Sequence, residues 1–291
     1  MSFLRKERLF WTEALTVAGS SLPLVLPRAL VFALFALAVT AVHFDTSLPD
    51  VSIELTPYEV VGGVLSLLLV LRTNAGYERW WEARRIWGDI VNRSRSLAVS
   101  ALAYGADDRE WSDWIVRRTA CFCHAARMSL RGQREPDAFE RLVGRDEAAR
   151  ILAARHMPMA TAALIAAGLR DARDRLGLDG FAFLRLDQDR TALIDDIGGC
   201  ERILKTPLPL AYRVEIRRIL ILFIGASPFA LVDRVGWMTP VVTALIALPL
   251  LAIDKIGTEL QDPFSHVSLN HLPLDDICST IEGDLLNLLD P

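Results

Sequence analysis

Residues 60–92 read VVGGVLSLLLVLRTNAGYERWWEARRIWGDIVN, and this stretch decides the fold. Its first twelve residues, 60–71, are uncharged, and charged and aromatic side chains are frequent from Arg72 onward. Because no proline interrupts it, the pattern predicts one continuous helix that leaves an apolar environment at Arg72 and continues into water. The apolar part is short for a lipid-exposed span, so it is more typical of a helix that is buried in a bundle or lines a pore.

The overall composition fits a protein that has both a membrane part and a large water-exposed part. The chain has 291 residues, of which 52% are hydrophobic, and its mean hydropathy is +0.29. A net charge of −4 provides no global positive field that would attract nucleic acid. Arginines and tryptophans alternate at residues 79–87, but pairs such as Arg79–Glu82 have the spacing of helix neighbours, which favours a helix with interfacial tryptophans over base stacking. We therefore expect no nucleic-acid partner.

Four apolar segments predict four membrane helices. They lie at residues 22–42, 60–71, 219–232 and 235–253. A short interfacial helix is expected in residues 1–21, with Leu4, Trp11 and Leu15 as membrane contacts. Glu13 and Arg28 interrupt this basic and apolar start, which argues against a cleaved signal peptide.

The middle of the chain is charged and predicts a helical region without strands. Amphipathic patterns occur near residues 78–104, 108–131, 145–154, 158–177 and 187–205. We divide the chain into an N-terminal helix with two membrane helices (1–71), a cytoplasmic helical region (72–208), two further membrane helices (209–257) and a cytoplasmic tail (258–291).

Basic residues predict the orientation in the membrane. Of the 32 Lys and Arg residues, four lie in residues 1–28, twenty-six in residues 72–218 and one at Lys255. Only Arg234 falls in the opposite loops. Since basic loops stay in the cytoplasm, both termini and the large middle region are expected there.

The sequence contains no enzyme signature such as GxSxG, HExxH, GxGxxG or a phosphate-binding loop, and a membrane-bound enzyme would need a polar cluster that is not visible. Cys121-x-Cys123-His124 has no matching second half, and its thiols are expected to be free, as is typical of a reducing compartment. His266 and His271 share a loop without a recognisable set of further ligands. We expect no catalytic residue, no metal site and no cofactor.

Three motifs are similar to those of the bestrophin family, in its bacterial branch. RTNAGYERWWEARRIWG at residues 72–88 resembles the signature of the family. TPLPLAY at residues 206–212 resembles the Pro-x-x-Tyr start of the third membrane segment, and DPF at 262–264 resembles the Asn/Asp-Pro-Phe that follows the last one. The motifs occur in the family's order, and the resemblance covers nearly the whole chain.

The resemblance implies an all-α homopentamer in the bacterial inner membrane, with four membrane helices per subunit around a central pore. It also implies that the second membrane helix forms a hydrophobic neck, whose matching positions here are Gly63, Leu67 and Leu71. These residues are spaced by four and share one helical face, so five copies would form stacked rings that gate by dewetting. Gly63 stands where the family usually has a bulky residue, which predicts a wider mouth. Periodicity alone favours ordinary core positions for Leu67 and Leu71, and only the resemblance to the family reverses this interpretation.

The resemblance further implies a second constriction at the cytoplasmic exit, formed by a residue roughly 28 positions before Pro209. That residue is Phe181, with Phe183 and Leu184 as neighbouring alternatives, and Phe181 could otherwise be a buried core aromatic. Calcium-gated animal members carry consecutive acids after the Asn-Pro-Phe motif. Residues 265–271 (SHVSLNH) lack these carboxylates, so no calcium site is expected there.

Ion selectivity is the least determined property. Eukaryotic bestrophins conduct mainly chloride, whereas bacterial members can conduct sodium or potassium. Residues 72–218 contain 26 basic and 21 acidic residues, and Asp187 and Asp189 lie near the expected aperture, where acidic rings would favour cations. The resemblance favours chloride, with a monovalent cation channel as the alternative and a membrane scaffold without a pore as a more distant one.

Overall fold

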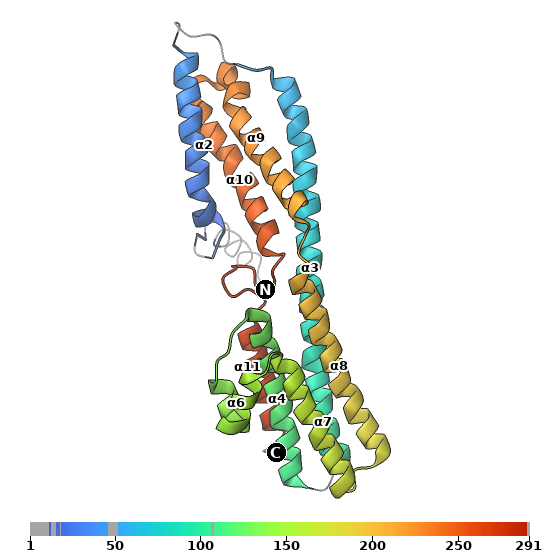
Figure 1. Ribbon diagram of the computed structural model, residues 1–291. Coiled ribbons are helices and arrows are strands. Elements are labelled where there is room, and N and C mark those ends of the chain that lie inside the picture. Colours follow the sequence, from blue (N-terminus) through green and yellow to red (C-terminus); the bar gives the residue numbers. More distant parts are fainter. Residues whose placement is uncertain (1–11, 13–15, 18, 46–51, 106–107, 290–291) are drawn as a thin grey trace, which may run out of the picture. The chain divides into compact units, whose positions relative to one another are not determined.

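A computed structural model describes residues 12, 16–17, 19–45, 52–105 and 108–289, and the regular elements in these residues are helices (Figure 1). In chain order they are α2 (Leu22–His43), α3 (Leu55–Tyr104), α4 (Arg109–Arg131), α5 (Asp137–Val143), α6 (Arg145–Ala153), α7 (Met157–Arg175), α8 (Gly180–Lys205), α9 (Leu210–Val235), the 3₁₀ turn η1 (Gly236–Met238), α10 (Thr239–Glu259) and α11 (Leu274–Asn287). Most of the expected interfacial helix, including Leu4, Trp11 and Leu15, lies outside the described residues.

Helix α3 confirms the prediction of one continuous helix. It is 50 residues long and extends beyond the quoted stretch at both ends. Pro57 is in its first turn, where a missing backbone N–H does not break a helical hydrogen bond. No further proline follows before the end of the helix, so nothing in the sequence stops it earlier.

The chain divides into two compact units. Unit 1 comprises Met1–Glu78, Leu208–Gln261 and Val267–Asn270, and unit 2 comprises Arg79–Pro207, Asp262–His266 and His271–Pro291. Helix α3 contributes its first part to unit 1 and its second part to unit 2. The units therefore alternate along the chain.

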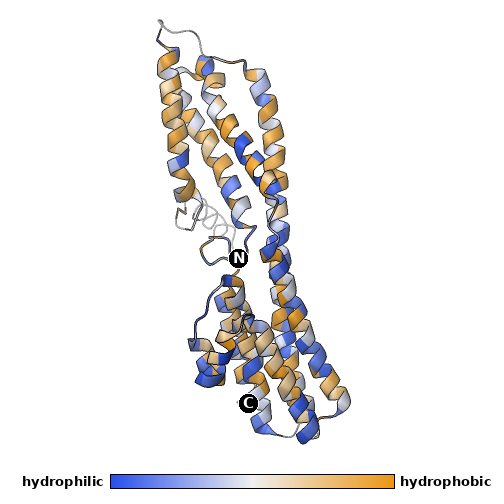
Figure 2. Cartoon of the chain, viewed as in Figure 1, coloured by the Kyte–Doolittle hydropathy of each residue, from blue (hydrophilic) through white to orange (hydrophobic). Residues whose placement is uncertain are grey.

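Unit 1 contains the segments that could cross a membrane. Among the described residues, three segments have the length and apolarity of a span: Leu22–His43, Leu55–Tyr104 and Leu210–Glu259. The third segment includes α9, η1 and α10. Figure 2 shows that α2, the first part of α3 and most of α9 and α10 are hydrophobic, whereas the second part of α3 carries many hydrophilic residues. Helix α9 is longer than the expected 219–232, because it begins directly after Pro209 and continues to Gly236, where a φ of 53° ends it. Helix α10 is shifted toward the C-terminus relative to the expected 235–253.

The core of unit 1 joins its four helices. It is formed by Val25, Ala29, Leu65, Leu69, Ile216, Leu220, Ile224, Ala247 and Leu251. Close helix contacts depend on glycine. A Cβ added at Gly76 would lie 3.0 Å from the carbonyl oxygen of Gly257, so α3 and α10 cross at two residues that lack side chains. Small residues allow such close approach of helices in membrane proteins.

Unit 2 is a helical bundle with its own core, whose largest fully buried side chains include Trp87, Phe122 and Phe139. The observed α4, α6 and α7 agree with the predicted helices to within two residues. The prediction near 187–205 was too short, since α8 begins at Gly180, where the Asp179 side chain accepts hydrogen bonds from the first backbone N–H groups. Helix α5 was not predicted.

The acidic tail forms helix α11, which the sequence reading also missed. Its apolar face, Leu274, Cys278, Ile281 and Leu285, has helical spacing and is buried in the core of unit 2. Its acidic face meets arginines of other helices. Asp275 pairs with Arg127 and Arg131, Asp284 with Arg95, and Glu282 with Arg141 and His124. The acidic residues therefore hold the tail against unit 2.

We expect Gly168→Ala to destabilise unit 2. A Cβ at Gly168 would lie 2.1 Å from a ring carbon of Trp114, so the tryptophan or the backbone of α7 must move. Overpacking of this kind costs about 1–3 kcal/mol. The measurement is the midpoint of thermal unfolding in detergent. Gly198→Ala is the matched control, because a Cβ at this helical position meets no atom within 4 Å and alanine favours a helix. An equal loss in both variants would contradict the packing at Trp114.

We also expect the stability of unit 2 to decrease as the pH is lowered, because of the buried side chain of His124. This side chain is 4% exposed, and its Nε2 lies 2.7 Å from Glu282 Oε2. Burial lowers the pKa of His124, assisted by Arg127 and Arg141 and opposed by Glu282. As the pH falls below the ordinary histidine pKa of about 6.5, the unfolded chain takes up a proton that the folded chain does not, so stability decreases.

The test compares thermal unfolding of the wild type and His124→Gln between about pH 7.5 and about pH 5.5. The wild type should lose more stability over this range than the variant. Burial raises the pKa of Asp196 to about 6 and also raises that of Asp189, and these groups favour the folded state as the pH falls, so only the difference between the two proteins is informative. His266→Gln, an exposed substitution, should behave as the wild type does. Identical pH profiles for all three would contradict a neutral buried His124.

Candidate functional site

The neck residues predicted on α3 lie on the surface of the subunit. Leu67 is 61% exposed and Leu71 is 51% exposed, and a Cβ at Gly63 would meet open space. On the other side of the same helix, Leu65 and Leu69 are fully buried in the core of unit 1. Leu67 and Leu71 are therefore not core residues of the subunit, and they form an exposed apolar row with the spacing that a pore lining needs.

A buried ion pair fixes which side of α3 faces outward. Arg72 is 1% exposed, and its Nη1 pairs with Oδ1 of Asp254 on α10. Its Nη2 donates a hydrogen bond of 2.9 Å to Thr258 Oγ1. Since successive residues of a helix point about 100° apart, holding Arg72 inward turns the adjacent Leu71 toward the surface. The close crossing of Gly76 and Gly257 one turn later supports the same orientation.

Phe181 lies in the first turn of α8 and is 85% exposed. The Asp179 side chain caps this turn by accepting hydrogen bonds from the backbone N–H groups of Phe181 (2.9 Å) and Ala182 (3.2 Å). Phe181 is thus not the buried core aromatic that was the alternative. Of its two neighbours, Phe183 packs against the core of unit 2 with its ring 5.2 Å from the Arg173 guanidinium, whereas Leu184 is 54% exposed.

The two aspartates predicted near the aperture differ in their surroundings. Asp187 is half-buried, and its Oδ1 lies 2.6 Å from Arg190 Nε. Asp189 is 7% exposed, with Arg185 3.4 Å from its carboxylate. Burial raises the pKa of Asp189, against the opposing effect of Arg185 and Arg93. A carboxylate inside the subunit gives no support to the prediction that Asp189 is a pore charge, and Asp187 is partly neutralised by its neighbour.

The predicted residues fall in different parts of the molecule. Gly63, Leu67 and Leu71 belong to unit 1, and Phe181, Asp187 and Asp189 belong to unit 2.

The four cysteines are free and buried: Cys121, Cys123, Cys200 and Cys278. Burial raises the pKa of each thiol, that of Cys123 to about 12. Over the part of the chain that the structure describes, no three His, Cys, Asp or Glu side chains come close enough together to hold a metal ion.

The sequence reading missed the polar cluster around Asp254. Arg217 of α9 approaches the same two partners as Arg72, with its Nε 3.6 Å from Asp254 Oδ2 and its Nη2 3.3 Å from Thr258 Oγ1. The sequence did contain one indication of it, because Asp254 directly follows an apolar segment, and acids at such positions are commonly paired with a basic residue. The partner itself is far away in the sequence, so the pairing was not readable.

Comparison with known proteins places this geometry in context. A family model described as bacterial/fungal bestrophin protein matches residues 2–287. A protein of Nostoc sp., named a voltage-dependent anion channel-forming protein, is 33% identical over 279 residues, which are 94% of this chain and 90% of that protein. A protein of Escherichia coli K12 with the same description is 33% identical over 275 residues, which cover 94% and 89% of the two chains.

A solved structure agrees with the fold as well. The crystal structure of a bacterial bestrophin homologue from Klebsiella pneumoniae superposes with a TM-score of 0.82 at 26% sequence identity. The match covers 92% of this chain and 98% of that one. The arrangement of helices described above is therefore similar to that of an experimentally determined protein along nearly its whole length.

Proposed function

We propose, because the chain belongs to the bacterial and fungal bestrophin family, that it forms an anion channel in a membrane. Relatives named voltage-dependent anion channel-forming proteins cover more than nine-tenths of the chain, which supports the anion preference. In finer detail, we propose a homopentamer with four membrane helices per subunit, α2, the first part of α3, α9 and α10. It would conduct chloride across the bacterial inner membrane, with both termini in the cytoplasm.

The exposed leucine row on α3 is the observation that carries the proposal. In an assembly around an axis, this row faces its copies, and Leu67 and Leu71 each contribute one side chain per subunit to an apolar ring. A narrow apolar ring holds no stable column of water and so closes the pore by dewetting. Ions pass when the rings widen, without any covalent step. Gly63 adds no side chain to its ring, which leaves the outer mouth wider.

Phe181 is the proposed second constriction. A phenylalanine that is 85% exposed in a water-exposed bundle is unusual, since its ring would be stabilised by burial. Its position in a capped first turn holds the backbone in place while the ring projects from the subunit. Five rings around an axis would narrow the cytoplasmic exit. Leu184 is exposed on the next turn and would line the same wall.

The alternative of a monovalent cation channel rests on acidic rings near this exit. Asp189 is inside the subunit and Asp187 has an arginine 2.6 Å away, so neither presents an unpaired negative charge. These two surroundings favour the anion channel. A scaffold without a pore is the further alternative, and it does not explain why the Phe181 ring is exposed.

The test of the neck is the double variant Leu67→Ala and Leu71→Ala, recorded in planar bilayers under an asymmetric salt gradient. Truncating both rings removes the dewetting barrier, so we expect the open probability or the conductance to rise several-fold. Leu222→Ala is the matched control, because Leu222 is a leucine of α9 that is 70% exposed and does not belong to the row. Its currents should equal those of the wild type.

The same recordings test the selectivity. A reversal potential close to the chloride equilibrium value supports the anion channel, and one close to the cation value supports the alternative. Unchanged currents in the double leucine variant would contradict a neck at these positions. An absence of current in both the wild type and the double variant, from an oligomer that is stable in detergent, would favour the scaffold.

A second prediction separates the role of Phe181 from that of its neighbour. Phe181→Ala should leave the midpoint of thermal unfolding unchanged, since the ring makes few contacts within the subunit, and should alter conductance or relative anion permeability. Phe183→Ala should lower the unfolding midpoint, because this ring packs on the core. The expected loss in the free energy of unfolding is about 3 kcal/mol. Equal permeability in the wild type and Phe181→Ala would remove this residue from the pathway.

A further inference from the structure

A cluster of arginines in unit 1 has more positive charge than its acidic partner neutralises. Arg72 and Arg217 both approach the carboxylate of Asp254 and the hydroxyl of Thr258. Thr258 donates its own proton to the carbonyl of Asp254, so its oxygen is free to accept from both guanidinium groups. Two full positive charges therefore share one negative charge and one neutral acceptor.

Arg213 adds a third charge on the same side of α9. It lies four residues before Arg217, a spacing that places two side chains on neighbouring turns of one helical face. Its Nε is buried and has no hydrogen-bond partner, and the same is true of the Nε of Arg72. Buried N–H donors normally have a partner, so these two donors are available to an acceptor from outside the chain.

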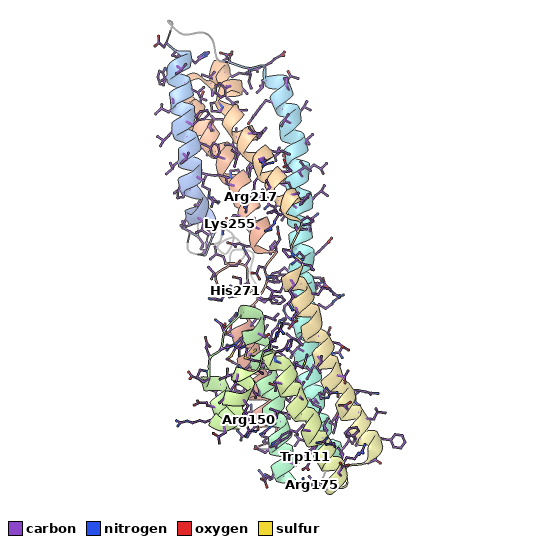
Figure 3. All side chains as sticks on the ribbon, viewed as in Figure 1. Trp111, Arg150, Arg175, Arg217, Lys255 and His271 are labelled. Carbon is purple, nitrogen blue, oxygen red and sulfur yellow. The ribbon has the colours of Figure 1, made fainter. Side chains whose placement is uncertain are left out.

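The remaining charges nearby are already paired. Arg218 lies 2.6 Å from Glu215, and Lys255 lies 3.1 Å from Glu259. Among the described residues, Asp254 is the acid that pairs with Arg72 and Arg217, so together with Arg213 these arginines have a surplus of about two positive charges, a number that fits one or two phosphate groups. Figure 3 labels Arg217 on α9 and Lys255 on α10, the two helices that bring this region together.

The position of the cluster relates it to the membrane. On α9 the apolar run at residues 219–232 starts directly after Arg217 and Arg218, and on α10 the apolar run at 235–253 ends directly before Asp254. Both helices therefore change from apolar to charged at this level, which is where lipid headgroups lie. The Arg217 side chain is 52% exposed, so one edge of its guanidinium is open to a ligand.

We propose that Arg213 and Arg217, backed by the buried Arg72, bind the phosphate of an anionic phospholipid headgroup. Arginine presents parallel N–H donors that match two phosphate oxygens, and basic pockets between membrane helices recognise such headgroups. The buried Arg72–Asp254 pair acts as the fixed wall of the site. This assignment is independent of ion conduction and needs only that unit 1 lies in a membrane.

The experiment is a lipid titration of the purified, delipidated full-length protein, followed by native mass spectrometry. Dioleoyl-phosphatidylglycerol is compared with dioleoyl-phosphatidylcholine, which has the same acyl chains and a zwitterionic headgroup. Arg217→Gln should weaken phosphatidylglycerol binding about fivefold, and Arg213→Gln with Arg217→Gln about 25-fold, the factors expected for about 1 kcal/mol per arginine. Phosphatidylcholine binding should change little in either variant.

Arg218→Gln is the matched control, since it removes the same charge from the adjacent position, where the side chain is 66% exposed and already paired with Glu215. Its affinity for phosphatidylglycerol should equal that of the wild type. A loss as large as that of Arg217→Gln would overturn the site in favour of diffuse electrostatic attraction. Displacement of phosphatidylglycerol by millimolar inorganic phosphate would assign the site to free phosphate and overturn the lipid.

Discussion

The buried pair of Arg72 and Asp254 is the interaction on which the rest of unit 1 depends. Removing two charges from water is costly, and their attraction compensates only when the remaining donors and acceptors find partners. Thr258 supplies one of these partners, and the Gly76–Gly257 crossing brings the two helices close enough for the contact. Another rotation of α3 would leave Arg72 or Asp254 as a buried charge without its partner, which is strongly destabilising.

This constraint has consequences along the whole of α3. With Arg72 inward, Leu65 and Leu69 enter the core of unit 1, while Leu67 and Leu71 remain on its surface. The same continuous helix then supplies Ala83, Trp87 and Ile90 to the core of unit 2. The exposed row at the proposed neck is therefore specified by buried residues on the opposite side of α3.

Local patterns predicted the elements that have strong local signals. The change from apolar to charged residues at Arg72 predicted a long helix, and amphipathic spacing predicted α4, α6 and α7. Helix α11 was missed because its many acidic residues resembled a solvated tail. Its arginine partners lie on α3, α4 and α5, more than a hundred residues away in most cases, and only the fold brings them together. The start of α8 was missed because one capping aspartate determines it.

The candidate site was predictable only in part, for the same physical reason. Spacing placed Leu67 and Leu71 on one face, but it did not show whether that face was core or surface. Asp187 and Asp189 were both named because they lie near the expected aperture in the sequence, but a helix turns two such positions to different sides, and Asp189 is buried in the subunit. Burial on a helix follows from packing against distant segments, and no local pattern contains that information.

The exposed aromatic in unit 2 adds an observation that the exposed leucines in unit 1 do not provide. In a membrane, lipid tails cover a leucine face at no cost, so Leu222, which is 70% exposed, needs no explanation beyond lipid. In the described residues of unit 2, no helix other than α3 has the length and apolarity of a membrane span, and a ring that is 85% exposed there meets water unless another subunit surrounds it. The cap at Asp179 holds the backbone of Phe181 in that position, although its ring is mostly exposed within one subunit. Its exposure is therefore what the proposed assembly requires, and it supports the proposal independently of the leucine row.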